Sequence, residues 1–434
     1  MKKILYLPTR YFPSISGAEF YIQRMAELLS TRYNYHTDVY TSNAIDFKAL
    51  RSTQGKIIEE NNKFFDKVNN LKIMRFSIET ELTLEEKISH LKNIPEYRVL
   101  NLSDQCLKLF LNNGPYLPEL INYSLNSKNK DYTLVHTVFF PYFNLIITLI
   151  LGERYKIPTI CTPFFHFSNP RYLNERLMEV LRTFDLLIAC TFLEKKFLIK
   201  HCKIDEGRVK VIPMGVDMEK FEVVSKPKSL DPTFKEKFFK KKEKNYKMVL
   251  FCGYKNYEKG AISLLKSIPK ILDKIKKVYF VFIGPSTQAY NRELSKIVKI
   301  KNVRIINFTP DNLTGYYDKK KLAAFKETDL YCMPSRSDAF GIAFLEAWAA
   351  RKPTIGANIG ATPEVINNNV DGYLVEYDNP HDIADKVITL LKKKRLRTRF
   401  GEAGKIKVSQ HYTWEIVAEK THVLYQELIK NTPK

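Results

Sequence analysis

The sequence predicts an α/β protein built from two doubly wound, parallel-sheet domains that face each other across a cleft. Three observations lead to this prediction. The chain has 434 residues, which is more than a single domain usually contains. In each half, short apolar runs alternate with longer amphipathic stretches, as in parallel sheets covered by helices. Between the halves lies a basic stretch, "FKEKFFKKKEKNYK" at 234–247, which favours a linker or a surface helix.

The first half opens with the strand "KKILYLP" and continues with an amphipathic helix over 17–32. Its remaining strands are expected at 36–42, 132–138, 158–164, 185–191 and 209–216. The apolar stretch 138–151 is interrupted by Pro141 and Asn144, and it is shorter than the ~20 residues of a membrane-spanning helix, so we expect a buried helix. Residues 47–125 are charged and weakly periodic, and we expect extra strands and helices there, over the ligand-binding face.

The second half repeats the alternation. Its strands are expected at 248–254, 277–284, 303–308, 329–335, 353–357 and 372–376, before a helical tail over 413–430. Within it, the apolar run Leu330–Met333 ends at Pro334, which predicts a buried strand. Small and turn-forming residues from 335 to 341 predict a loop. Good helix formers from 342 to 351 predict a helix that Pro353 stops.

The composition suggests an anionic partner and a reducing compartment. Seventy Lys and Arg residues against 47 Asp and Glu residues give a net charge of +23. Such a charge fits anionic lipid, nucleic acid or phosphorylated ligands, but a solvated lysine-rich surface explains it equally well. The six cysteines show no CxxC spacing, which indicates free thiols in a cytoplasmic protein. The N-terminus predicts a first strand, because it is too short and too interrupted for a signal peptide.

Two acids frame the start of one predicted helix, in "DAFGIAFLEA" at 338–347. Asp338 lies in the loop and Glu346 about one turn into the helix, so the pair spans a pocket where ligands of doubly wound sheets bind. The helix N-terminus offers free N–H groups, and Gly341 lets the backbone approach a ligand closely. A carboxylate can accept hydrogen bonds from two vicinal hydroxyls. The alternative is that Asp338 caps the helix and Glu346 is solvated.

With this segment after a predicted strand, the chain resembles the retaining glycosyltransferases of family 4, which have the GT-B architecture of two Rossmann-like domains. The resemblance covers nearly the whole length and is strongest from 211 to 412, including "VKVIPMGVD" at 209–217, where Gly215 and Asp217 shape a turn. It implies a domain organisation in four parts. These are an acceptor-binding domain at 1–220, a basic linker at 221–246, a nucleotide-sugar-binding domain at 247–412, and a C-terminal helix at 413–434 that crosses back to the first domain.

The resemblance also implies roles for individual donor-binding residues. Asp338 would bind the hydroxyls of the donor sugar, although the family usually has glutamate there. The backbone of Phe340, Gly341 and Ile342 would hold the phosphates at the helix N-terminus. Glu346 would accept hydrogen bonds from the ribose hydroxyls.

A second family segment is "GYKNYEKG" at 253–260, where the family usually has Gly-Arg and then Lys-Gly. Lys259 and Gly260 match, and Lys259 would neutralise the diphosphate leaving group. Tyr254 stands at the arginine position. Lys255 would supply the missing charge, but it cannot make the planar bidentate contact of an arginine.

Three residues of the first half complete the expected site. Gly17 stands where the family has a glycine-rich loop against the donor phosphate. His136 begins a family His-x-His pattern whose second position is Val138 here, and His166 in "TPFFHFSNPRY" would take over its contact to the sugar or the acceptor. For either histidine, the alternative is a hydrogen-bonded structural residue.

The expected reaction moves a hexose from a nucleoside diphosphate sugar to a glycan or lipid-linked acceptor with retention, and Asp338, Lys259, His166 and His136 are its candidate catalytic residues. No metal and no cofactor other than the donor is expected, and no nucleic-acid partner. Peripheral contact with an anionic membrane at its inner face is a hypothesis from the charge. Two alternatives stay open: a glycoside hydrolase that uses Asp338 and Glu346 as its acid and base, and a catalytically weak relative that binds glycans or anionic surfaces.

Overall fold

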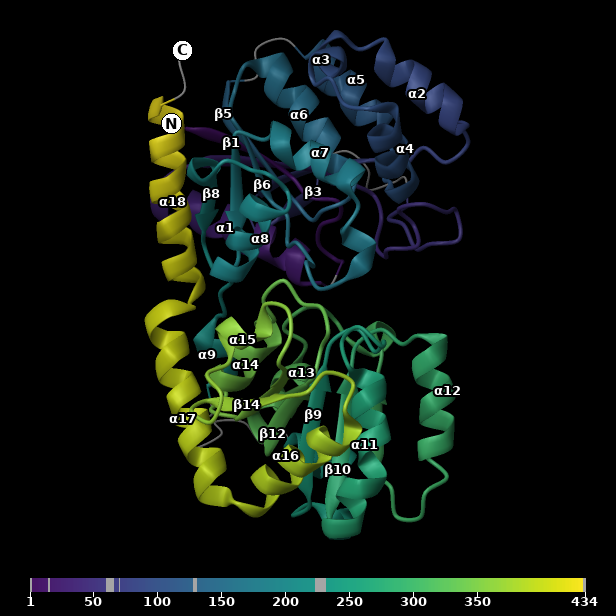
Figure 1. The fold of residues 1–434 in the computed structure, drawn as a ribbon, viewed down its shortest axis with the longest axis vertical. Coiled ribbons are helices and arrows are strands. Elements are labelled where there is room, and N and C mark those ends of the chain that lie inside the picture. The colour runs from purple at the N-terminus through teal and green to yellow at the C-terminus, as the bar shows by residue number, and fades with distance from the viewer. Residues whose placement is uncertain are drawn as a thin grey trace. The chain divides into compact units, whose positions relative to one another are not determined.

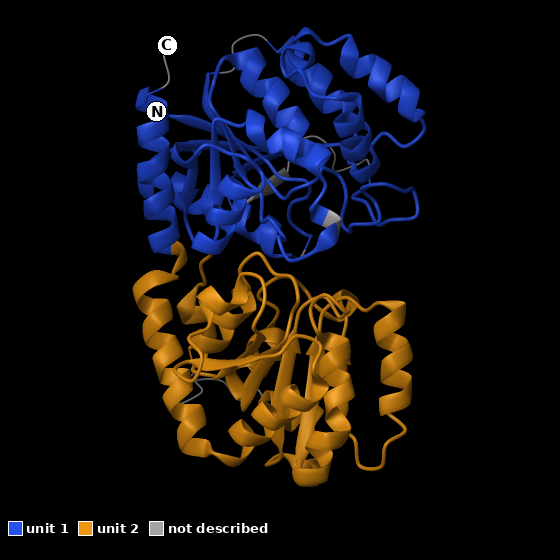
Figure 2. Cartoon of the chain, viewed as in Figure 1, with its two compact units in different colours: residues 1–213, 415–434 blue, residues 214–414 orange. Residues whose placement is uncertain are grey.

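The computed structural model describes residues 2–14, 16–59, 66–69, 71–127, 131–222 and 232–431, and it divides into two compact units (Figures 1 and 2). Unit 1 comprises Met1–Pro213 and Glu415–Lys434, and unit 2 comprises Met214–Trp414. Each unit is a largely parallel sheet with helices around it, which confirms the predicted fold class. Residues 223–231 of the predicted linker lie outside the described residues.

The described part of unit 1 contains an eight-stranded sheet in the order β3-β4-β2-β1-β5-β6-β7-β8, parallel except for the β3–β4 pair. Its strands are β1 (Lys3–Leu7), β2 (His36–Ser42), β3 (Asp66–Val68), β4 (Leu71–Phe76), β5 (Tyr132–Val138), β6 (Thr159–Thr162), β7 (Leu186–Ala189) and β8 (Val209–Val211). Its helices are α1 (Gly17–Tyr33), α2 (Leu84–Lys92), α3 (Pro95–Val99), α4 (Asp104–Asn113), α5 (Pro118–Asn126), α6 (Asn144–Tyr155), α7 (Glu175–Thr183), α8 (Phe192–Lys200) and α18 (Trp414–Asn431).

Helix α6 is the apolar stretch of the sequence, and it belongs to the core of unit 1. Its residues from Leu145 to Leu151 are buried against the sheet and the neighbouring helices. At its N-terminus the Asn144 side chain donates to the Leu7 carbonyl at 3.1 Å and to the Val138 carbonyl at 2.9 Å, so it joins the ends of β1 and β5. Among the helices that the structure describes, none is both long and apolar enough to cross a membrane.

Helix α18 returns to the sheet of unit 1, as the predicted architecture requires. The Tyr425 hydroxyl lies 3.2 Å from the Tyr6 hydroxyl of β1, and His422 Nδ1 lies 3.1 Å from the Tyr35 hydroxyl. These contacts join residues about four hundred positions apart, and they place the C-terminal helix in the same compact unit as the first strand.

The described part of unit 2 contains a six-stranded, fully parallel sheet in the order β11-β10-β9-β12-β13-β14. Its strands are β9 (Lys247–Cys252), β10 (Val278–Ile283), β11 (Ile305–Phe308), β12 (Leu330–Met333), β13 (Thr354–Ala357) and β14 (Gly372–Val375). Its helices are α9 (Met218–Phe221), α10 (Phe234–Phe238), α11 (Ala261–Lys274), α12 (Gln288–Ile297), α13 (Lys319–Glu327), α14 (Ile342–Ala349), α15 (Thr362–Val365), α16 (Pro380–Lys392) and α17 (Lys394–His411).

The strand order of unit 2 reverses between β9 and β12. From β9 the chain builds outward through β10 to β11, and from β12 it builds in the other direction through β13 to β14. Ligands of doubly wound sheets bind beside the carboxyl ends of the strands at such a reversal. The loops that follow β9 and β12 are therefore the expected ligand loops of unit 2.

The basic stretch 234–247 packs on unit 2. The Phe239 ring stacks on the Tyr279 ring with centroids 3.7 Å apart, and Phe234 is buried. The Glu327 carboxylate accepts a hydrogen bond from the Lys235 N–H at 2.9 Å. Aromatic residues interleaved with the lysines hold this stretch against the domain. The stretch is therefore a surface element of unit 2 that begins with α10.

Candidate active site

An ion pair joins the two ligand loops of unit 2. The Lys259 ammonium, in the loop after β9, lies 2.7 Å from an Asp338 carboxylate oxygen in the loop after β12, and it donates to the Ser337 carbonyl at 3.2 Å. Both side chains stay partly accessible, at 21% and 14%. A second pair beside it joins Arg336 to Glu258, whose carboxylate accepts from Arg336 Nε at 3.0 Å. The structure thus brings together Lys259 and Asp338, two of the catalytic residues that the sequence predicted.

Two glycines with positive φ shape the start of the helices at this site. Gly260 caps α11 at φ +75°, and a β-carbon there would lie 2.2 Å from the Pro334 carbonyl oxygen. Gly341 caps α14 at φ +96°, and a β-carbon there would lie 2.6 Å from the Phe344 ring. Only glycine fits both conformations without strain. The helix α14 therefore begins at Ile342, directly after Gly341, as predicted, and its N-terminus can receive an anion.

Glu346 is neither solvated nor exposed. The residue is 1% exposed, and its Oε1 lies 2.7 Å from the Lys321 ammonium of α13. The Tyr316 hydroxyl is a second partner of the carboxylate, and burial raises the pKa of this tyrosine well above its usual value. The Lys321 ammonium also lies 3.8 Å from the centroid of the Tyr316 ring. Glu346 was recognisable from its motif, but Lys321 and Tyr316 were not, because neither belongs to a motif of the sequence.

Lys255 does not replace the missing arginine, which corrects the role predicted for it. The residue is fully buried, and its ammonium donates to Asn307 Oδ1 at 2.6 Å and to the Phe308 carbonyl at 2.8 Å. Burial lowers the pKa of Lys255 to about 8. Its neighbour Tyr254 is 41% exposed. Successive side chains of an extended segment point to opposite sides. Because Tyr254 is exposed, the Lys255 side chain points into the domain and not toward a bound nucleotide sugar.

His136 has a structural position in unit 1, which corrects its predicted catalytic role. It is fully buried at the end of β5, and Nε2 lies 2.9 Å from the Thr162 hydroxyl. Nδ1 is hydrogen-bonded to the Tyr425 hydroxyl of α18. Burial lowers the pKa of His136 to about 3, so the ring is neutral at ordinary pH. With both nitrogens bonded inside the core, the imidazole cannot reach a substrate.

The other two predicted residues of unit 1 lie at the carboxyl edge of its sheet. Gly17 is the first residue of α1, and Ser16 is its N-cap. His166 follows β6 and is partly exposed, with its ring stacked on Tyr172 at a centroid distance of 5.1 Å. Both positions are compatible with ligand contact, and their roles stay predictions.

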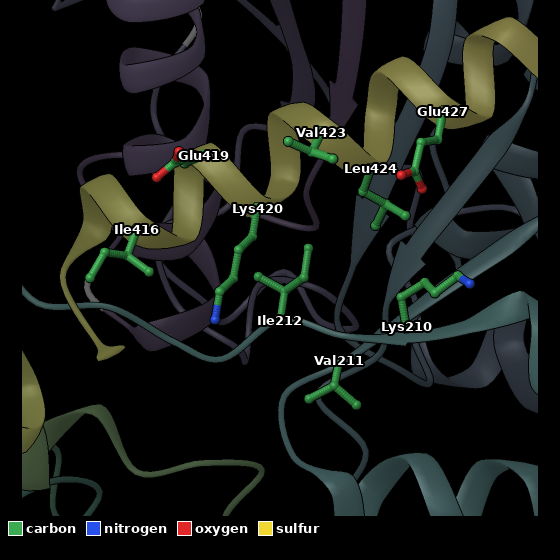
Figure 3. Close-up of a pocket in the computed structure, with 9 residues that line it drawn as sticks. All are labelled: Lys210, Val211, Ile212, Ile416, Glu419, Lys420, Val423, Leu424 and Glu427. Atoms are coloured by element: carbon green, nitrogen blue, oxygen red, sulfur yellow. The ribbon is translucent and has the colours of Figure 1, made fainter. Parts of the chain in front are cut away.

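A shallow groove of about 450 Å³ on unit 1 lies apart from all of these residues (Figure 3). It runs between β8 and α18, with Lys210, Ile212, Lys420 and Val423 among its lining residues. Its lining mixes charged and aliphatic side chains and includes none of the predicted site residues. Among the described residues, no three His, Cys, Asp or Glu side chains are grouped so that they could hold a metal ion.

Comparison with known families and proteins gives two matches to family models. The model described as "Glycosyl transferases group 1" matches residues 233–407, and the model described as "Glycosyltransferase Family 4" matches residues 82–220. The D-inositol 3-phosphate glycosyltransferase of Corynebacterium jeikeium is 26% identical over 58% of this chain and 59% of its own length. An uncharacterised glycosyltransferase of Methanocaldococcus jannaschii is 21% identical over 98% of this chain and 99% of its own length. Two further curated relatives from that archaeon are covered over only 47% and 62% of their length.

Solved structures match over the whole chain. Anabaena HepE in complex with UDP and glucose has a TM-score of 0.69 at 14% identity, covering 98% of this chain and all of that one. Sucrose-phosphate synthase from Thermosynechococcus elongatus has a TM-score of 0.71 at 16% identity, covering 99% of this chain and all of that one. At these identities the likeness concerns the fold, which is GT-B.

Proposed function

The chain belongs to the glycosyltransferases of the GT-B fold that the group 1 and family 4 models describe, and from this premise we propose that it is a retaining hexosyltransferase. The donor is a nucleoside diphosphate sugar, with UDP or GDP as the nucleotide. The acceptor is a glycan or a lipid-linked glycan. Catalysis requires no metal ion.

The Lys259–Asp338 pair at the reversal of the unit 2 sheet is the observation that carries this proposal. A nucleotide sugar presents an anionic diphosphate and a hydroxyl-rich ring side by side. An ammonium suits the first and a carboxylate suits the second. The N-terminus of α14 adds backbone N–H groups for a phosphate oxygen. Further support comes from HepE, whose fold is similar and which was solved with UDP and glucose.

The chemistry that this site must assist is the departure of the diphosphate from the anomeric carbon. Lys259 stabilises the negative charge that develops on the leaving phosphate, and Asp338 holds the sugar in place while positive charge develops on its ring. In the front-face mechanism that we propose, a leaving phosphate oxygen accepts the proton of the attacking acceptor hydroxyl. The new bond then forms on the face that the diphosphate leaves, which retains the anomeric configuration.

The hydrolase alternative fits these contacts less well. A glycosidase needs one carboxyl group as a proton donor beside a second carboxylate. Here Asp338 is paired with Lys259, and Glu346 is buried against Lys321. Each acid therefore has its own lysine partner, and the burial of Glu346 keeps it from flanking a glycosidic bond together with Asp338.

The first experiment is a thermal-shift screen with UDP, GDP, ADP, dTDP and their hexose conjugates, with EDTA present. A ligand that binds the folded chain raises its melting temperature. We expect one nucleotide series to do so, and we expect Glu346→Ala to abolish the effect. Glu402→Ala is the matched control, because Glu402 is a partly exposed acid of α17 that pairs with Arg351.

A transfer reaction with the donor identified in this screen then tests whether the anomeric configuration is retained. We expect the anomeric proton coupling in the NMR spectrum of the product to match that of the donor. An inverted product would refute the retaining mechanism. Absence of any nucleotide shift, together with cleavage of a glycan, would favour the hydrolase.

For the acceptor, we propose a molecule presented at an anionic membrane surface. The net charge of +23 supports this, as does α8, where Phe192 is 63% exposed on a helix that also carries Lys195 and Lys196. Flotation with anionic vesicles at low salt tests it. Protein that stays entirely in the soluble fraction would exclude this contact.

A further inference from the structure

The two partners of the Glu346 carboxylate differ in how firmly the fold holds them. Lys321 lies in the first turn of α13, which Asp318 caps by accepting from the Lys320 N–H at 2.7 Å. Tyr316 lies outside every helix and strand, directly after Gly315, which has φ +152°. The lysine is therefore fixed by a capped helix, whereas the tyrosine belongs to a short loop.

The loop is anchored on both sides of Tyr316. The Thr314 N–H and hydroxyl both donate to the Asp318 carboxylate at 2.9 Å. The Tyr317 hydroxyl donates to the Asp217 carboxylate. Tyr316 can therefore leave Glu346 while the residues that flank it keep their own hydrogen bonds.

The burial of Glu346 restricts how a ligand can reach its carboxylate. The residue is 1% exposed, so an incoming hydroxyl reaches the carboxylate only if a side chain that covers it moves. Displacing Lys321 would leave a charge buried without its partner, which is strongly destabilising. Displacing the neutral Tyr316 hydroxyl exchanges one O–H donor for another and keeps the hydrogen bonds of the carboxylate satisfied.

We propose that the Tyr316 hydroxyl occupies the place of a donor ribose hydroxyl on Glu346 and leaves when the nucleotide binds, while Lys321 is the positioning residue that keeps the carboxylate in place. This inference rests on the proposed function, because it requires a ribonucleotide donor. It makes Tyr316 a competitor of the ligand and Lys321 a determinant of affinity for the ribose.

Calorimetric titration with UDP and with 2′,3′-dideoxy-UDP tests this, with GDP and its dideoxy form in parallel. Tyr316→Phe removes the competing hydroxyl and keeps the ring over Lys321. We expect the affinity for the ribonucleotide to rise by about three- to tenfold, the value of one neutral hydrogen bond, and the affinity for the dideoxy form to stay unchanged. Weaker or unchanged binding of the ribonucleotide would overturn the proposal.

The Lys321 variants separate positioning from general support of the fold. Lys321→Met should lower the affinity for the ribonucleotide by about tenfold or more, while the dideoxy form is affected much less. Lys321→Arg should restore part of the preference for ribose. An equal loss for both ligands would show that Lys321 is only structural.

Tyr279→Phe is the matched control, since Tyr279 donates to Glu243 at 2.6 Å at the opposite end of the sheet strands and Arg304 also binds Glu243. It should leave both affinities unchanged. If the native chain binds neither UDP nor GDP, the proposed function fails and this inference fails with it. If it binds one of them and Tyr316→Phe has no effect, only the inference fails.

Discussion

Replacing Lys255 by methionine tests the burial of a titrating amine at the end of β9. The side chain is fully buried, with the Asn307 amide oxygen and the Phe308 carbonyl as acceptors. Burial lowers the pKa of Lys255 from 10.5 to about 8. Methionine has a similar length and no charge, so Lys255→Met removes the titration with little change in packing.

The pKa determines both the sign and the size of the effect. Between pH 8 and 10.5 the unfolded chain keeps the lysine proton and the folded chain has released it, so the unfolded state binds more protons. The contribution of Lys255 to the stability of unit 2 therefore rises with pH through this window, and it is lost as the pH falls back toward 8. The change between pH 7 and pH 10 is about 2.5 kcal/mol.

Tryptophan fluorescence is a probe for this measurement. The chain has two buried tryptophans: Trp348 lies in α14 of unit 2, and Trp414 is the last residue of unit 2 and the first residue of α18. Urea unfolding of the native chain and of Lys255→Met at pH 7, 8, 9 and 10 then gives the free energy of unfolding of that unit. We expect the two to be close at pH 7, because the variant loses the cost of a buried charge but leaves two acceptors without a donor.

By pH 10 the native chain should have gained about 2.5 kcal/mol over the variant. Lys266→Met, at an exposed position of α11, is the control and should follow the pH profile of the native chain. Parallel profiles for the native chain and Lys255→Met would refute the reasoning, because they would mean that Lys255 has the same pKa in the folded and unfolded states.

Three further changes probe the candidate active site. Asp338→Asn keeps the size of the side chain but loses its charge, so the affinity for the nucleotide sugar should fall by about tenfold or more while that for the free nucleoside diphosphate changes less. Calorimetry with both ligands checks this, and equal losses would contradict it. Gly260→Ala places a β-carbon 2.2 Å from the Pro334 carbonyl oxygen and should cost unit 2 about 2–4 kcal/mol in urea unfolding. A cost below about 0.5 kcal/mol would contradict the strain argument. Lys321→Met removes the ion-pair partner of the buried Glu346 and should cost about 3–5 kcal/mol, part of which Glu346→Gln should restore in the double variant. A double variant no more stable than the single one would show that the charge is not the cause.

The type and order of the elements follow from local signals. Leu330–Met333 is a strand in the structure with the bounds that its apolar run predicted, and Thr354–Ala357 begins one residue later than the strand predicted at 353–357. The helix between them starts at Ile342 as predicted and ends at Ala349, two residues earlier than the helix-forming run. An apolar run that ends at a proline is a local signal for a strand, and a glycine before good helix formers is a local signal for a helix start. Because each signal spans only a few residues, a single sequence is enough to recognise it.

The core of the candidate site was also predictable, but for a different reason. Lys259 and Asp338 each lie in a short motif, and each motif follows a predicted strand. Their ion pair depends on β9 lying beside β12, and the parallel sheet brings the two loops together across 79 positions. The motifs therefore indicated the residues, and the strand order decided that they meet.

Local sequence patterns were enough to predict the fold class and the residues of the main motifs, whereas the burial of individual polar side chains depends on how distant elements pack. Lys255 is held by residues about 50 positions away, His136 by a tyrosine 289 positions away, and Glu346 by Lys321, 25 positions before it. Whether a lysine meets a ligand or a carbonyl, and whether a histidine can titrate, depends on the elements that fold over it. Burial and the choice of hydrogen-bond partner are properties of the packed chain, and no local pattern of residues records them.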